Sequence, residues 1–239
     1  RAAGALDEAG HGVAAWLVDT SWDSTGVLVA PDGYVAAATA AVRDRGGLLI
    51  ADEVQAGYCR LGTHMWGHTR HGVVPDIVTL GKPMGAGHPV AAVITTPAIA
   101  AEFARRRSYF NTFGGNPVSA AVALAVLDVI DDEGLLANST RMGTVLGAGL
   151  TELAARHEVI GHVQGSGLFW GIDLVSDRDA RTPLDATAAE RVVSELRRRN
   201  VLVGLTGRHA NVVKIRPPLP FSDDHAEILL TALDQVLPR

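Results

Sequence analysis

Two short apolar runs, each ending in charged residues, constrain the fold most. Residues 48–51 (LLIA) lead into Asp52 and Glu53, and residues 77–80 (IVTL) lead into Gly81 and Lys82. Continuous apolar runs of this length are typical of strands buried on both faces of a parallel sheet. Because ligands of α/β sheets bind beyond the carboxyl ends of the strands, Asp52 and Lys82 are predicted to lie at the functional edge.

The other periodic segments predict two domains. Residues 13–19 and 90–95 read as further strands, and helices are predicted over 34–45, 97–106 and 116–130, so residues 1–135 should be α/β with a mostly parallel sheet. In the remainder, residues 136–239, short strands at 159–163, 168–174, 201–204 and 212–215 accompany helices at 138–157, 186–200 and 223–237. This second part is predicted to be a small α+β domain.

Composition excludes several classes of function. The net charge is −5 over 239 residues without a long basic run, which argues against a nucleic-acid-binding protein. No apolar stretch approaches the roughly 20 residues that a membrane span needs. The single cysteine, Cys59, allows no intrachain disulfide, and no compact set of His, Cys, Asp and Glu predicts a metal site. We therefore expect no metal and a cytoplasmic protein.

The charged residues at the two strand ends suggest a specific chemistry. A half-desolvated carboxylate such as Asp52 needs a cationic or hydrogen-bonding partner. Lys82 precedes PMGAGHP (residues 83–89), whose glycines allow a ligand to approach the backbone closely. An amine that condenses with an aldehyde cofactor, and a carboxylate that stabilises its protonated pyridine ring, could be Lys82 and Asp52. Taken alone, Asp52 could equally cap the next segment, and Lys82 could be a surface lysine.

Longer segments around these residues resemble a known family. Residues 48–62 (LLIADEVQAGYCRLG), 75–93 (PDIVTLGKPMGAGHPVAAV) and 109–120 (YFNTFGGNPVSA) resemble the class III aminotransferases in order and spacing, and residues 161–175 and 213–237 extend the likeness. These are pyridoxal-phosphate enzymes of fold type I. The resemblance implies the C-terminal portion of such an enzyme, with a large domain that is incomplete at its N-terminus and a small C-terminal domain.

The resemblance also implies roles for the residues of the DEVQ tetrad and for the lysine. Lys82 corresponds to the Schiff-base lysine that holds pyridoxal phosphate. Asp52 corresponds to the partner of the pyridine nitrogen, Val54 packs on one face of the ring, and Gln55 hydrogen-bonds its phenolic oxygen.

Two more residues match the family's motifs. Thr112 in NTFGGNP corresponds to a phosphate-binding threonine that the neighbouring subunit supplies, which implies a homodimer. A hydroxyl and the amides around Gly114 and Gly115 are suitable phosphate donors. Arg216 in KIRPP corresponds to the arginine that binds the substrate carboxylate. The planar guanidinium group of arginine can donate two parallel hydrogen bonds to a carboxylate.

The implied activity is transfer of an amino group from an amine or amino acid to a 2-oxo acid such as pyruvate or glyoxylate. Within the family, MGAGHPV and YFNTFGGNPVSA resemble both alanine:glyoxylate aminotransferases and phosphoethanolamine phospho-lyases, so a phospho-lyase acting on an amino-alcohol phosphate is the alternative. Because the family's upstream phosphate loop and stacking aromatic residue are absent, a third possibility is a catalytically incomplete fragment that serves for dimerisation or binding. Asp19 and Thr20 replace the usual Glu-Pro, which leaves substrate gating open.

Overall fold

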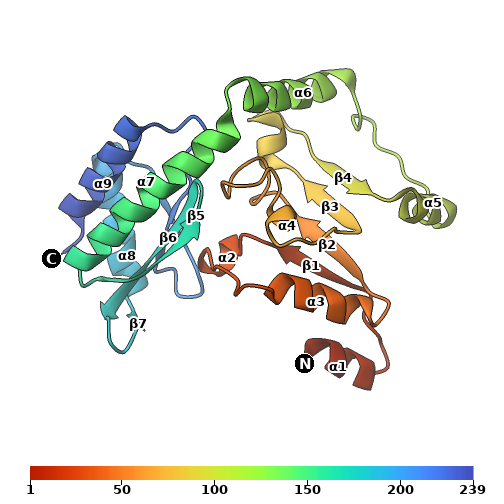
Figure 1. Ribbon diagram of the computed structural model, residues 1–239, viewed down its shortest axis with the longest axis horizontal. Coiled ribbons are helices and arrows are strands. Elements are labelled where there is room, and N and C mark those ends of the chain that lie inside the picture. Colours follow the sequence, from red (N-terminus) through yellow and green to blue (C-terminus); the bar gives the residue numbers. More distant parts are fainter. Residues whose placement is uncertain (239) are drawn as a thin grey trace. The chain divides into compact units, whose positions relative to one another are not determined.

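A four-stranded sheet organises the first part of the chain in the computed structural model, which describes residues 1–238. Strands β1 (Ala15–Asp19), β2 (Leu48–Asp52), β3 (Ile77–Leu80) and β4 (Ala92–Thr95) lie in the order β1-β2-β3-β4 (Figure 1). The first three strands pair in parallel, and β4 is antiparallel to β3. The three parallel strands therefore end at the same edge, as the apolar runs predicted.

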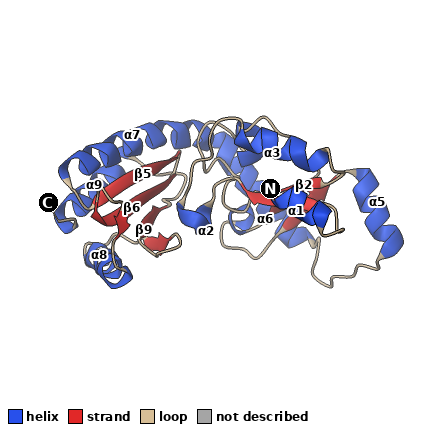
Figure 2. Ribbon diagram, turned by 90° about the horizontal axis from the view of Figure 1, so that it is seen from below, coloured by secondary structure: helices blue, strands red, loops and turns tan. Residues whose placement is uncertain are grey.

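Helices surround this sheet. Helix α3 (Tyr34–Arg43) packs on β1 and β2, and the 3₁₀-helix η1 (Lys82–Gly85) packs against α6 (Pro117–Asp132). Helix α6 begins where the Asn116 side chain accepts a hydrogen bond from Ser119 N, with proline at the first helical position. Helix α5 (Pro97–Arg106) buries no residue and stands off the sheet in Figures 1 and 2. Two short helices complete the set, α1 (Ala2–Glu8) and α4 (Gly67–Arg70).

The second part of the chain forms an antiparallel sheet with helices (Figure 2). Its strands are β5 (Ile160–Ser166), β6 (Phe169–Asp177), β9 (Val212–Ile215) and β8 (Gly204–Thr206), in the order β5-β6-β9-β8, with β7 (Thr182–Pro183) paired to β6. The helices are α7 (Leu135–Arg156), α8 (Ala186–Arg198) and α9 (Asp223–Val236). The short helix α2 (Asp23–Gly26) comes from much earlier in the chain and packs against β8. This is the predicted α+β arrangement.

One hydrophobic core holds this second sheet to its helices. Met142, Leu146, Leu150 and Leu153 follow one another at intervals of three and four along α7, and each is 1% exposed or less. That spacing places them on one face of the helix. Burying each such side chain contributes about 1.5–3 kcal/mol, so this row anchors α7 to the sheet.

The chain divides into two compact units. Residues 1–20, 30–58 and 66–133 form the first unit, and residues 21–29, 59–65 and those from 134 onward form the second. Whether these units correspond to a large domain ending at residue 135 and a small domain after it stays a prediction. Within residues 1–238 no helix is both long and apolar enough to cross a membrane.

The predicted strand at residues 201–204 is wrong, because the observed strand β8 is Gly204–Thr206. Val201 is buried for another reason. Its N–H donates a hydrogen bond to Leu196 O, and the preceding residue, Asn200, has a positive φ of 62°. This closure of a helix C-terminus commonly brings an apolar residue against the last turn. The apolar run thus marks the end of α8 rather than strand pairing.

Candidate active site

The edge at which the parallel strands end carries Asp52. Asp52 is in register with Asp19 of β1 and with Thr79 of β3. Its carboxylate is half-buried, and Oδ1 accepts a hydrogen bond from Val54 N at 3.0 Å. Within residues 1–238 no donor reaches its Oδ2 within hydrogen-bonding distance. A partly desolvated carboxylate with one oxygen available is suited to a cationic ring nitrogen.

Lys82 follows the neighbouring strand after one residue. Its φ is +33°, a left-handed conformation that strains a non-glycine backbone by about 1–3 kcal/mol. The sequence contains two lysines, and the other, Lys214, pairs with Asp23 at 2.9 Å. In the part of the chain that the structure describes, the Lys82 side chain makes no ion pair or hydrogen bond, and the residue is exposed. Lys82 therefore presents an amine that no other side chain engages.

Val54 lies against the turn that carries Lys82. A Cβ placed on Gly81 would lie 3.6 Å from Val54 Cγ2, an ordinary contact distance. Gln55 is half-buried directly after it. The structure thus brings Asp52, Val54, Gln55 and Lys82 to one end of one sheet.

Glu53, to which the sequence assigned no role, holds this end of the sheet in place. Its carboxylate is fully buried and accepts hydrogen bonds from Gly67 N at 2.7 Å, His68 N at 2.8 Å and His68 Nδ1 at 2.8 Å. Bonds to a charged acceptor are about twice as strong as neutral ones. The backbone between Asp52 and Val54 is therefore tied to the first residues of α4. The sequence signal for this role was a second carboxylate, directly after Asp52 at the end of an apolar run.

Thr112 lies in an exposed loop whose own side chains shape it. Asn111 Oδ1 accepts hydrogen bonds from Phe113 N at 3.1 Å and from Gly114 N at 2.9 Å. The Gly114 amide, expected to be a phosphate donor, is therefore already engaged within the loop. The Thr112 hydroxyl remains exposed to solvent.

A chain of side-chain contacts joins the turn after Lys82 to this loop. His88 Nε2 lies 2.8 Å from Ser119 Oγ, which also accepts a hydrogen bond from Asn116 Nδ2 at 2.9 Å. The same Asn116 amide donates to Phe113 O at 2.8 Å. His88 thus has a structural contact in this unit, and residues 1–238 place no group of three or more His, Cys, Asp or Glu that could hold a metal ion.

Arg216 belongs to the second unit, where it follows β9 directly and is exposed. Another arginine, Arg60, is close enough for their charges to interact. Burial lowers the pKa of the Arg60 guanidinium to about 10, and the positive charge of Arg216 contributes to the shift in the same direction. Two neighbouring guanidinium groups create a positive potential that attracts anions.

Comparison with known proteins defines the family. A sequence profile described as "Aminotransferase class-III" matches residues 2–237. The chain belongs to the class III aminotransferases.

Individual relatives differ in the reactions that their names describe. One relative is alanine–glyoxylate aminotransferase 2 homolog 2, mitochondrial, of Arabidopsis thaliana, to which the chain is 45% identical over 225 residues. The aligned residues make up 94% of this chain and 46% of the plant protein. A phospholyase from Arthrobacter, solved with phosphoethanolamine, superimposes with a TM-score of 0.94 at 44% identity, covering 98% of this chain and 56% of that one.

An amine transaminase from an uncultivated Pseudomonas species was solved in its PLP-bound internal aldimine form. It superimposes with a TM-score of 0.88 at 35% identity, covering 98% of this chain and 53% of its own. These structures confirm the predicted fold type I, and pyridoxal phosphate is the cofactor of the family. The chain spans about half the length of the relatives it matches.

The residues of the first unit fit this cofactor chemically. A half-buried carboxylate oxygen without a protein donor suits the ring nitrogen, and an unengaged lysine amine suits the aldehyde. The exposed Thr112 hydroxyl suits a phosphate.

Proposed function

We propose that Asp52, Val54, Gln55 and Lys82 hold pyridoxal phosphate at the end of the parallel sheet. When bound, this cofactor supplies an aldehyde that condenses with amines and a ring that withdraws electrons from the neighbouring bond. Asp52 keeps a proton on the ring nitrogen, Val54 covers one face of the ring and Gln55 donates to its phenolic oxygen. The hydroxyl of Thr112 binds the phosphate.

The reaction that we propose is transfer of an amino group from an amine or amino acid to a 2-oxo acid such as pyruvate or glyoxylate. Lys82 would hold the cofactor through its side-chain amine, and the same amine would move a proton at the substrate carbon. Arg216 binds the carboxylate of at least one substrate. The observation that carries this proposal is that a half-buried carboxylate and a lysine amine with no side-chain partner in residues 1–238 lie at the ends of neighbouring strands.

The test is an assay of amino transfer to pyruvate with the holoenzyme and two variants of Lys82. Lys82→Ala removes the amine, and Lys82→Arg keeps the positive charge but cannot condense with the aldehyde. Both variants should lose transfer by at least about a thousandfold, because both remove the nucleophile and the proton carrier. Activity retained in Lys82→Arg would mean that the lysine acts through its charge alone and would contradict the proposal.

A phospho-lyase is the second candidate, and the Arthrobacter phospholyase at 44% identity favours it. Both reactions require the same lysine, and they differ in whether phosphate leaves after proton removal. Incubation with phosphoethanolamine separates them. Release of inorganic phosphate without a 2-oxo acid acceptor identifies the lyase, whereas consumption of pyruvate without phosphate release identifies the aminotransferase.

We further propose a homodimer in which Thr112 reaches the cofactor phosphate of the partner subunit. Tyr109, Phe110 and Phe113 around it are 72%, 87% and 80% exposed, which is unusual for three neighbouring aromatic residues and typical of interfaces. Mixing Lys82→Ala with Thr112→Val subunits should restore part of the activity, because one site of each mixed dimer is then intact. No recovery in mixed dimers would contradict this arrangement.

A cytoplasmic location is also proposed. The chain has a single cysteine, the buried Cys59, and one cysteine allows no intrachain disulfide, which suits a reducing compartment. Because the similar plant protein is named as mitochondrial, fractionation of cells is the direct test: recovery in the mitochondrial fraction would contradict the proposal.

A further inference from the structure

The segment that follows Arg216 has few amides of its own with which to hold itself in place. Residues 217–221 (PPLPF), called the strap here, connect β9 to the N-terminal cap of α9. Three of the five residues are prolines, which have no N–H to donate. Most of the strap's carbonyl oxygens therefore depend on donors from elsewhere.

Arg60 supplies the first donor. Its Nη1 donates to Pro217 O and, at 3.2 Å, to Leu168 O. The arginine is itself anchored, because Leu168 N donates back to Arg60 O at 2.9 Å. The backbones pack so closely here that a Cβ on Gly167 would lie 2.7 Å from Arg60 O. Arg60 thus fixes the carbonyl of the residue next to Arg216.

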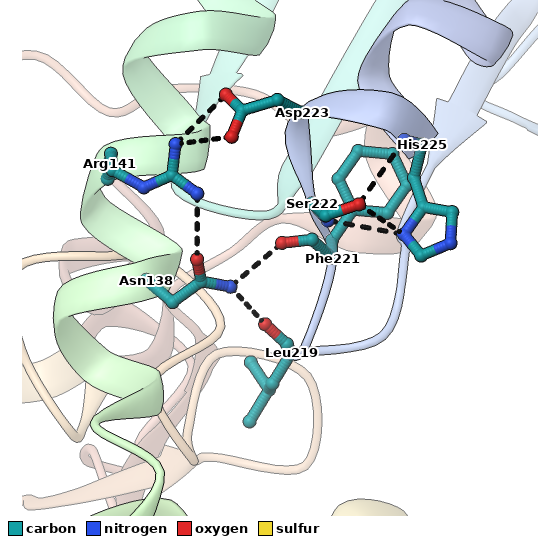
Figure 3. A network of polar contacts seen from close by, with 7 residues as sticks. All are labelled: Asn138, Arg141, Leu219, Phe221, Ser222, Asp223 and His225. Atoms are coloured by element: carbon teal, nitrogen blue, oxygen red, sulfur yellow. Dashed lines mark hydrogen bonds and ion pairs between the residues drawn. The ribbon is translucent and has the colours of Figure 1, made fainter.

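Asn138 of α7 supplies the next donors, as Figure 3 shows. Its Nδ2 donates to Leu219 O at 2.7 Å and to Phe221 O at 2.9 Å. Its Oδ1 accepts from Arg141 Nη2 at 3.3 Å, and Arg141 Nη1 contacts both carboxylate oxygens of Asp223 at 2.9 Å. The far end of the strap is therefore tied to α7.

Together these contacts engage four of the five strap carbonyls. Arg60 binds that of Pro217, Phe221 N binds that of Pro218 at 3.2 Å, and Asn138 binds those of Leu219 and Phe221. The proline rings restrict φ over the same stretch. Arg216 therefore lies between a paired strand, β9, and a strap whose backbone is held by hydrogen bonds.

We propose that Arg60 and Asn138 are positioning residues for Arg216, which hold its backbone so that the guanidinium meets a substrate carboxylate in one orientation. This inference rests on the proposed role of Arg216 in binding that carboxylate. A group held in advance loses less freedom when it binds, and a misplacement of about 1 Å can weaken its effect up to a hundredfold. Loosening the strap therefore weakens carboxylate binding and leaves the chemistry at Lys82 unchanged.

The experiment compares steady-state kinetics of the holoenzyme and its variants with a carboxylate-bearing substrate and with an amine that lacks a carboxylate. Arg60→Lys keeps the charge, but its shorter side chain does not place a donor against both Pro217 O and Leu168 O. Asn138→Leu removes the donors to Leu219 O and Phe221 O. For the carboxylate substrate, KM should rise about tenfold in each, with kcat within about twofold of the wild type. Kinetics with the amine, and the absorbance of bound cofactor, should not change.

Matched controls separate positioning from general damage. Arg178→Lys alters an arginine whose Nη2 donates to Ala154 O at 2.8 Å elsewhere in the same unit. Arg156→Gln breaks an ion pair with Asp234 at the C-terminal end of α7, away from Asn138. Both should keep the wild-type KM. If Asn138→Leu does not fold, Arg60→Lys decides the outcome.

Arg216→Gln separates the proposed carboxylate-binding role of Arg216 from the proposed positioning role of Arg60 and Asn138. If it raises KM and a second change at Arg60 adds nothing further, the residues act through Arg216 and the inference holds. If it raises KM while Arg60→Lys and Asn138→Leu do not, the positioning role is refuted and the proposed role of Arg216 stands. If Arg216→Gln leaves KM unchanged, the proposed role of Arg216 fails and the positioning role fails with it.

Discussion

Replacing Glu53 with glutamine tests whether the buried carboxylate holds the end of the sheet in place. Glu53 Oε1 accepts from His68 N and Nδ1, and Oε2 accepts from Gly67 N. A glutamine amide can keep the oxygen that faces His68, but its NH₂ group then meets the Gly67 N–H. One bond to a charged acceptor, about 1.5–3 kcal/mol, is lost and the other two become neutral. The predicted loss of local stability is about 2–4 kcal/mol.

Amide hydrogen exchange followed by mass spectrometry reads this change directly. Peptides that contain Gly67 and His68 should exchange about 30-fold to several hundredfold faster, because each 1.4 kcal/mol corresponds to a factor of ten in the opening equilibrium. Glu102→Gln is the matched control, since Glu102 is exposed on α5 and pairs with Arg105. It should leave exchange at α4 unchanged.

An unchanged exchange rate at Gly67 and His68 in Glu53→Gln would refute the reasoning. It would mean that packing alone holds α4 against β2. Weaker binding of the cofactor should accompany faster exchange, since Asp52 and Val54 flank Glu53.

Further predictions concern single residues of the first unit. In Gly67→Ala, the new Cβ would lie 2.2 Å from Thr20 Oγ1, so the melting temperature should fall by an amount that corresponds to about 1–3 kcal/mol; an unchanged value would contradict the close packing. The buried Thr20 hydroxyl has no hydrogen-bond partner within residues 1–238, so Thr20→Val should be neutral or should stabilise by about 1 kcal/mol, and a clear loss of stability would reveal a missed partner. Burial and the charge of Arg70 lower the pKa of His71 from 6.5, so its NMR titration midpoint should lie below that value. Because the folded state favours the neutral form of His71, the residue contributes to stability above pH 6.5, and this contribution is lost as the pH falls through the lowered pKa. A titration midpoint above 6.5 would contradict the predicted shift.

Local sequence patterns predicted the elements that place the candidate site. Short, mainly apolar runs mark β2 and β3, as is typical of strands in parallel sheets, and the residues that end the runs were therefore expected at one edge. Helix α5 was predicted with its observed bounds because Pro97 and a triplet of arginines mark its ends. The misplaced strand at residues 201–204 shows the limit, since capping contacts and strand pairing both bury apolar residues.

The contacts that hold the site in place could not be predicted from local patterns. Arg60 meets Pro217 across 157 positions of sequence, and Asn138 meets Leu219 across 81. A side chain that donates to a backbone carbonyl leaves no trace in the identity of its partner, because every residue has that oxygen. Glu53 is similar, since its partners are mainly amides of α4.

The central claim is that Lys82 is the amine that binds pyridoxal phosphate, and borohydride reduction tests it most directly. The protein is incubated with pyridoxal phosphate, its visible absorbance is recorded, and the reduced adduct is located by peptide mapping. The sequence contains only one other lysine, Lys214, whose amine is paired with Asp23. The account predicts an absorbance band and a label confined to Lys82. A folded protein that takes no label, or one labelled at Lys214, would contradict it and would favour a role limited to dimerisation or binding.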